Sequence, residues 1–167
     1  MALRAHGDRE MNTALTCRQL TIAAALAFGL LSTSPASASA QGVGMRTGVS
    51  VNPDQFYLGG HFDTGPIVER LHFRPNVEFG FGDDVTTTAI NLEFVYKWPV
   101  RRSPWTFYAG AGPAINIYNL DEHTDSEGGF NFLGGLEHDK GFFFEFKAGA
   151  WDSPDLKVGV GYTFRLR

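Results

Sequence analysis

The sequence predicts an all-β protein: an eight-stranded antiparallel up-and-down transmembrane β-barrel, preceded by a cleaved signal peptide. The first observation is that residues 156–167 alternate strictly between apolar and polar side chains, which is the period of a strand. The second is that this alternation recurs in eight runs that are separated by turn residues. The third is length, because most runs exceed the usual five or six residues and match a tilted strand that crosses a bilayer.

Residues 1–40 are interpreted as the signal peptide and residues 41–167 as the barrel domain. Arg4, Arg9 and Arg18 precede the apolar run 20–31, and the small residues 37–40 suit a signal peptidase. We expect cleavage after Ala40, with Met1 or Met11 as the start. An inner-membrane anchor is the alternative, but the apolar run is shorter than the roughly 20 residues that a spanning helix needs.

Composition excludes two further classes. Cys17, the only cysteine, lies before the apolar run, so neither lipoprotein attachment nor a disulfide is expected in the exported domain. From residue 41 onward there are 11 Lys and Arg against 16 Asp and Glu, a net charge of −5. A nucleic-acid partner is not expected, because a nucleic-acid binder would present a basic face.

The expected strands follow the chain in order, each ended by turn chemistry. The first two are bounded by the sequence Asn-Pro-Asp at 52–54 and Thr-Gly-Pro at 64–66, and the next two by paired aspartates at 83–84 and prolines at 99 and 104. A polar loop at 119–129, a turn at 138–141 and Asp-Ser-Pro-Asp at 152–155 separate the others. Pro75 and Pro113 lie inside runs, where we expect a bulge or a strand end. The eight expected strands are 43–52, 55–63, 70–82, 85–98, 105–118, 130–138, 142–151 and 156–166.

The alternation separates an apolar, aromatic-rich face from a face of charged residues and glycines. In a membrane the charged face must point inward, because an Arg or Lys facing the bilayer midplane costs roughly 2–4 kcal/mol. The interior of an eight-stranded barrel is just wide enough for side chains to fill, so opposite charges there should pair. The expected interior charge network is Arg46, Arg74, Glu78, Glu93, Lys97, Glu137, Glu145, Lys147, Lys157 and Arg165. His61 and His72 share this face, as members of a hydrogen-bonded core rather than metal ligands.

A soluble barrel would invert the two faces. The apolar side chains, some thirty by our count, would then fill the interior of a lipocalin-like periplasmic carrier of a small apolar ligand. So many large side chains overfill a barrel of this size. We keep this carrier as the alternative function.

The final strand, with Val-Gly-Val-Gly-Tyr-Thr-Phe at 158–164, closes a pattern that resembles the small outer-membrane β-barrels of Gram-negative bacteria. These are barrels of the OmpX, OmpA transmembrane-domain and opacity-protein type. The resemblance covers residues 42–167 and implies location in the outer membrane, among its lipids and lipopolysaccharide. It also implies that the last strand, through Tyr162, Phe164 and Leu166, is read by the barrel-insertion machinery. In that family the strand usually ends on an aromatic residue, whereas here Arg165, Leu166 and Arg167 follow Phe164.

The resemblance implies that the barrel begins on the periplasmic side, so the outer loops would be 52–54, 83–84, 119–129 and 152–155. These loops are acidic and contain no Lys or Arg. Asp121, Glu122, Asp125 and Glu127 are candidates for binding divalent cations, with a solvated loop surface as the alternative. No catalytic residues are assigned, because no serine lies in a His-x-Ser motif, and no cofactor or zinc motif is present. The sequence thus predicts a monomeric membrane barrel with a sealed polar core, a structural or surface-interaction role and no catalysis.

Overall fold

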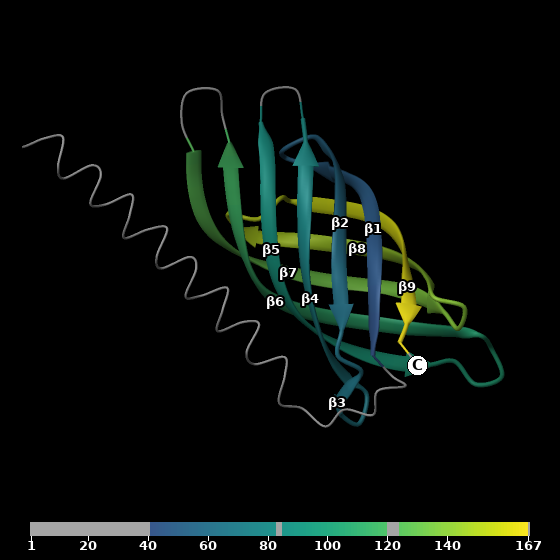
Figure 1. Cartoon of the computed structure of the whole chain (residues 1–167). Helices are drawn as coiled ribbons and strands as arrows, with labels where there is room; N and C mark the ends of the chain where they lie inside the picture. The colour runs from purple at the N-terminus through teal and green to yellow at the C-terminus, as the bar shows by residue number, and fades with distance from the viewer. Residues whose placement is uncertain (1–40, 83–84, 120–123, 167) are drawn as a thin grey trace, which may run out of the picture. The chain divides into compact units, whose positions relative to one another are not determined.

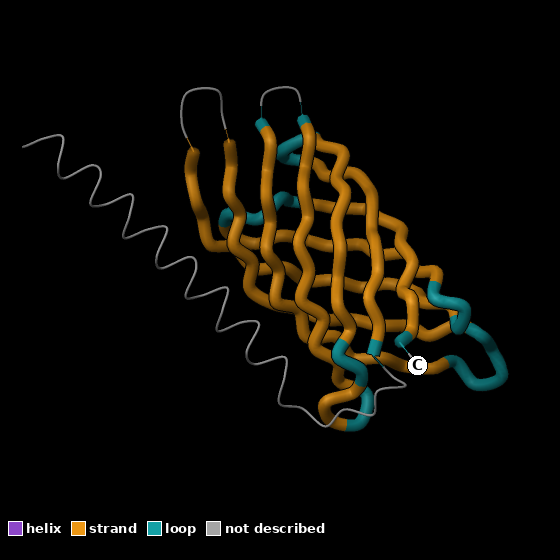
Figure 2. The backbone as a smooth tube through the Cα atoms, in the orientation of Figure 1, coloured by secondary structure: helices purple, strands orange, loops and turns teal. Residues whose placement is uncertain are grey.

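The computed structural model describes residues 41–82, 85–119 and 124–166. The predicted signal peptide and the loop residues Asp121 and Glu122 lie outside the described residues. Within the described part, no helix is long and apolar enough to cross a membrane. The described elements are all strands (Figures 1 and 2): β1 Gly42–Val51, β2 Gln55–Asp63, β3 Pro66–Val68, β4 Leu71–Phe81, β5 Thr86–Pro99, β6 Trp105–Asn119, β7 Thr124–His138, β8 Phe142–Trp151 and β9 Leu156–Arg165.

Eight of these strands form a closed antiparallel barrel. Each strand pairs with its neighbour in the chain, except that β2 pairs with β4 past the short β3. The first and last strands close the ring, from Gly42 opposite Arg165 to Val51 opposite Leu156. Closure leaves no exposed sheet edge around the ring. The predicted eight-stranded up-and-down barrel is therefore confirmed.

Two elements differ from the prediction. The run expected as a loop at 119–129 is mostly strand, because β7 begins at Thr124 and pairs with β6 from Thr124 opposite Asn119. This polar segment lacks apolar alternation, yet it forms ladder hydrogen bonds with β6 on one side. The other difference is β3, a three-residue strand that pairs with β4 only and that shows a shift in register.

Each of the two prolines inside strands lies where one of the two neighbouring strands forms no ladder pair with it. Pro75 is opposite Leu92 of β5, but on its other side the pairing of β4 with β2 ends at Asn76. Pro113 lies in a gap of the β5–β6 ladder, between the pairs at 91 and 94 of β5. Neither proline needs the bulge or strand end that the sequence suggested, because each falls where no backbone donor is required.

The two faces of the barrel have opposite chemistry. Buried polar and charged side chains fill the interior, and the large exposed side chains are apolar, including Phe94, Phe146 and Val158 at 46%, 59% and 38% exposure. The small apolar core inside consists of Val95, Tyr108, Leu133 and Phe143. The alternative with inverted faces is therefore wrong: a carrier of apolar ligands needs an apolar interior, and the described interior is charged.

The barrel has two distinct ends, which we name for what they contain. The loop end has the connections β1–β2, β4–β5, β6–β7 and β8–β9. The terminal end has the first and last residues of the barrel, where the Leu166 amide donates to the Gln41 carbonyl at 2.8 Å. It also has β3 and the turns β5–β6 and β7–β8. Figure 1 shows the paired ends of β4 and β5, and of β6 and β7, extending at the loop end.

Candidate functional site

The centre of the barrel is an ion-pair cluster formed across the lumen. Glu78 of β4 accepts from Lys147 of β8 at 2.6 Å and from Lys157 of β9 at 2.8 Å. The Arg46 guanidinium of β1 lies 3.3 Å from the same carboxylate. The side chains of Glu78 and Lys147 are 1% and 2% exposed, so the pair is screened from water. Removing one member of such a buried pair leaves an uncompensated charge.

Two further carboxylates complete this central cluster. Glu145 of β8 binds the Arg46 guanidinium at 2.8 Å and the Arg74 guanidinium at a shorter distance, and it accepts from the Tyr108 hydroxyl at 3.0 Å. Glu93 of β5 lies 2.6 Å from the Lys147 ammonium. Each carboxylate is shared by cations from more than one strand, so the cluster ties opposite walls of the barrel together.

Aromatic rings also contact the buried cations of the central cluster. The Arg74 guanidinium lies 4.7 Å from the centre of the Tyr108 ring and 5.7 Å from that of Phe143. The Lys157 ammonium lies 5.5 Å from the Tyr57 ring. Such cation–π contacts are stronger where water is excluded. They let bulky charged and aromatic residues share a narrow lumen.

Toward the loop end, the charged cluster gives way to buried amides. Asn91 donates to Asn76 at 2.8 Å, and Asn131 donates to Asn91 at 2.7 Å. These three side chains come from β4, β5 and β7, and each is at most 3% exposed. Amide side chains both donate and accept, so they can continue a hydrogen-bonded layer without adding charge.

The β8–β9 loop folds into the loop end of the barrel. Ser153 and Pro154 are buried although they lie in a connection. The Asp152 carbonyl accepts from the Asn116 amide at 2.7 Å and from the Tyr118 hydroxyl at 3.0 Å. Partial burial, with smaller contributions from the carboxylates of Glu127 and Asp152, raises the pKa of Tyr118 above its ordinary value. The loop therefore covers the interior from this side.

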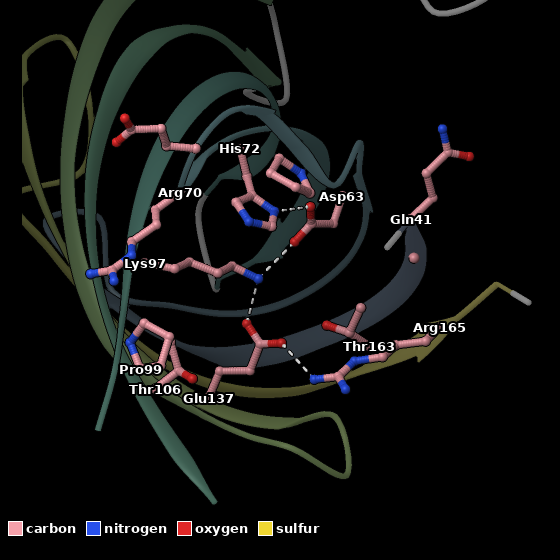
Figure 3. Close-up of a pocket in the computed structure, with 13 residues that line it drawn as sticks. Gln41, Asp63, Arg70, His72, Lys97, Pro99, Thr106, Glu137, Thr163 and Arg165 are labelled. Carbon is pink, nitrogen blue, oxygen red and sulfur yellow. Dashed lines mark hydrogen bonds and ion pairs between the residues drawn. The ribbon is translucent and has the colours of Figure 1, made fainter. Parts of the chain in front are cut away.

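At the terminal end, a chain of charges spans the mouth of the barrel (Figure 3). The Asp63 carboxylate lies 2.7 Å from the His72 ring and 2.9 Å from the Lys97 ammonium. Lys97 also binds Glu137 at 2.7 Å, and Glu137 lies 3.7 Å from the Arg165 guanidinium. These groups line a cavity of about 390 Å³. None of the residues of the central cluster lines this cavity.

The structure places nine of the ten predicted network residues in the interior, in two groups. Arg46, Arg74, Glu78, Glu93, Glu145, Lys147 and Lys157 form the central cluster, and Lys97 and Glu137 belong to the terminal mouth. Arg165 differs, because its side chain is 51% exposed at the rim. It is the last residue of β9, where the lumen opens to solvent. The structure thus places Arg165 at the rim of the terminal mouth rather than in the interior.

Sequence reasoning missed several interior residues. Asp63 is 4% exposed and binds both His72 and Lys97, whereas the sequence pattern marks it only as the end of a strand. The asparagines of the amide layer were not singled out. A usable signal was present in both cases, because these residues lie in the charged phase of the alternation. His61 does join the polar interior, 3.0 Å from the Thr163 hydroxyl.

The remaining predicted residues lie at the surface. Phe164 faces outward at 49% exposure, Tyr162 packs against it with ring centres 4.7 Å apart, and Leu166 follows the end of β9. Asp125 and Glu127 line a cavity of about 410 Å³ at the loop end. Among the residues that the structure describes, no group of three or more His, Cys, Asp or Glu side chains could hold a metal ion.

A closed eight-stranded antiparallel barrel, charged inside and apolar outside, is the architecture of the class of small transmembrane β-barrels. Two solved structures have a similar fold. The N-terminal β-barrel domain of Pseudomonas aeruginosa OprF matches with a TM-score of 0.57 at 16% identity, over 74% of this chain and 96% of that one. Neisserial surface protein A (NspA) matches with a TM-score of 0.62 at 11% identity, over 75% of this chain and 96% of that one. At such identities the likeness shows the fold. No family model and no curated protein matches the sequence.

Proposed function

We propose that this chain is an integral protein of the Gram-negative outer membrane, with a sealed polar core, a structural or surface-interaction role and no catalytic activity. One observation carries the proposal: the apolar residues form the outside of a barrel whose inside is charged. Such an exterior would be exposed to water in a soluble protein, whereas it is solvated by hydrocarbon in a bilayer. Its partners are then outer-membrane lipid and lipopolysaccharide.

The sealed core is supported at three depths. The charge chain from His72 to Arg165 crosses the terminal mouth, the central cluster fills the middle, and Ser153 and Pro154 cover the loop end. A solute would have to break several buried ion pairs to pass. Because the lumen of eight strands has no spare width, a continuous pore is not expected.

A permeability experiment tests the sealed core. The purified protein is reconstituted in planar bilayers and in liposomes that contain sugars, with a general porin as the positive control. We expect no steady conductance and no sugar-dependent swelling. Steady single-channel currents that scale with the amount of inserted protein would overturn the sealed core while leaving the membrane location intact.

The surface-interaction role is supported by the extension at the loop end. β6 and β7 have 15 residues each, against 10 for β1, β8 and β9. Residues 124–128 of β7 pair with β6, but the pairing of β7 with β8 begins only at Gly129 opposite Trp151. These residues are exposed. The β6–β7 hairpin therefore extends beyond β8 at the loop end, where its exposed side chains can meet a partner.

Protease added to intact cells tests location and orientation together. We expect cleavage in the β6–β7 hairpin and none in the β5–β6 turn, because only the loop end would face outward. Cleavage of the β5–β6 turn in intact cells, with the loop end protected, would show the opposite orientation. A protein that fractionates with the soluble periplasm would contradict the membrane location itself.

A further inference from the structure

We propose that three cations in two turns of the terminal end bind the phosphate of an anionic glycerophospholipid headgroup. The cations are Arg101 and Arg102 of the β5–β6 turn and Lys140 of the β7–β8 turn, which together we call the cationic turn patch. The inference rests on the proposed membrane function and deepens it. It names the lipid class that surrounds this end of the barrel and the residues that select it.

The two turns form one unit. The Asp139 amide donates to the Pro104 carbonyl at 2.8 Å, which joins the β7–β8 turn to the β5–β6 turn. The Trp105 ring stands edge-on to the His138 ring, with centres 4.7 Å apart and planes at 85°. The β5–β6 turn is closed by the Val100 amide, which donates to the Trp105 carbonyl at 3.0 Å. The three cations are therefore held on neighbouring turns of the same rim.

The positive charges of the cationic turn patch are available to a ligand. Arg101, Arg102 and Lys140 are exposed, and none forms an ion pair with another residue in the described ranges. Asp139, next to Lys140 in the same turn, is 60% exposed and lies 2.7 Å from the His138 ring, so the three cations outnumber this carboxylate. Two guanidinium groups can bind phosphate oxygens in a bidentate manner, and an ammonium adds a third charge-assisted donor.

The depth of the patch matches that of lipid headgroups. Trp98 is 45% exposed at the end of β5, and Trp105 begins β6, so these rings flank the β5–β6 turn. The exposed Phe107 and Phe144 follow toward the middle of the barrel. Amphipathic aromatic rings collect at the membrane interface, with apolar residues in the hydrocarbon next to them. Cations one turn beyond such rings lie among the phosphates.

The opposite end shows that this charge is specific to one leaflet. The exposed charged residues that the structure describes at the loop end are acidic: Asp54, Asp125, Glu127, Asp152 and Asp155. An anionic headgroup would be repelled there and attracted at the terminal end. The barrel thus carries an axial charge difference, which favours anionic phospholipid around its terminal end.

Tryptophan quenching by brominated lipids tests the inference at each end separately. The protein is expressed from its full-length sequence, purified in detergent and reconstituted in vesicles of phosphatidylcholine and phosphatidylglycerol, one of them carrying brominated acyl chains. One variant keeps only Trp105, through Trp98→Phe and Trp151→Phe. The other keeps only Trp151, through Trp98→Phe and Trp105→Phe. The degree of quenching reports which lipid contacts each ring.

We expect phosphatidylglycerol to be preferred about fivefold at Trp105, the size expected when one further headgroup charge meets a surface cation. No preference is expected at Trp151. The preference should vanish in 1 M salt, where the screening length is about 3 Å. The triple variant Arg101→Gln, Arg102→Gln and Lys140→Gln should also abolish it, whereas the control Asp54→Asn should leave it unchanged.

The outcomes distinguish failure of the lipid site from failure of the proposed membrane function. Equal quenching at Trp105 by both lipids, or a preference that survives the triple substitution, overturns the lipid site while the membrane function stands. Absence of quenching by either lipid overturns the membrane function and the lipid site with it. If the triple variant does not fold, as judged by gel mobility before and after boiling, the salt titration of the unsubstituted patch decides.

Discussion

At the scale of single residues, Glu78 is the carboxylate on which the interior depends most. It is 1% exposed and faces Arg46, Lys147 and Lys157. Lys147 also lies 2.6 Å from Glu93 and Arg46 also lies 2.8 Å from Glu145, whereas Lys157 forms no other ion pair among the described residues. The charge of Glu78 thus determines whether the buried Lys157 is compensated, and it adds to the compensation of Arg46 and Lys147.

We predict that Glu78→Ala lowers the free energy of unfolding by about 3–5 kcal/mol, the usual cost of leaving buried charges without a partner. Urea-induced unfolding in lipid vesicles, followed by tryptophan fluorescence, measures it. The matched control is Asp54→Asn, an exposed carboxylate at the loop end that should change stability by less than about 0.5 kcal/mol. Equal effects of the two substitutions would show that the central cluster does not stabilise the barrel.

On the outward face, Val158 tests the assignment of sides. It lies in β9 opposite Val49 and Phe146, at 38% exposure. We predict that Val158→Arg prevents insertion into vesicles, because a lipid-facing Arg near the midplane costs about 2–4 kcal/mol. The control Val158→Leu should insert normally. The fraction that shifts in gel mobility on boiling reports insertion, and full insertion of Val158→Arg would refute the assigned face.

At the scale of elements, the β8–β9 loop is held by close backbone contact as well as by hydrogen bonds. A Cβ atom at Gly149 would meet the carbonyl oxygens of Ser153 and Pro154. Because these are backbone atoms, the loop itself would have to move. The Gly149 amide also donates to the Asp155 carbonyl at 3.1 Å. The glycine in β8 therefore makes the covered loop end possible.

We predict that Gly149→Val displaces this loop and lowers stability by about 1–3 kcal/mol, the cost of overpacking. The displaced loop should become a site of limited proteolysis in reconstituted vesicles, while the barrel strands stay protected. Gly128→Val is the matched control, since a Cβ there meets no atom within 4 Å. A Gly149→Val loop as resistant as the original would contradict the packing described.

Whether an element can be predicted from the sequence depends on whether it lies inside or outside the membrane-spanning part of the barrel. Inside the membrane the alternation is enforced by lipid on one face and charge on the other, so the eight barrel strands and their orientation were predictable. Outside the membrane-spanning part, the alternation is no longer enforced. Thr124 to Gly129 has no apolar alternation, so the sequence predicts a loop there, although the segment pairs with β6. The short β3 was missed for the same reason.

The partners inside the barrel could not be predicted from the sequence. Alternation places Glu78 and Lys147 on the same face, but only register and closure bring them to 2.6 Å. The alternation assigns Lys97 to one network with the central charges, yet it binds Asp63 and Glu137 at the terminal mouth. Arg165 was assigned inward by phase, and its position at the end of β9 leaves it in solvent.

At the scale of the whole molecule, the inside-out distribution of polarity explains both the fold and the proposed setting. The barrel buries its charges and presents its aromatic and aliphatic side chains to the surroundings. In water this arrangement exposes far more apolar surface than soluble monomers tolerate. In a bilayer the exposed apolar side chains face hydrocarbon, and the buried interior charges of the described barrel are kept away from it.

Refolding of residues 41–167 in detergent micelles and in plain buffer tests this account most directly. Circular dichroism reports sheet content, and gel mobility of boiled against unboiled samples reports a stable barrel. We predict β-sheet structure and a mobility shift only in detergent, because the apolar face needs a hydrocarbon environment. A soluble, folded monomer in plain buffer would contradict the account.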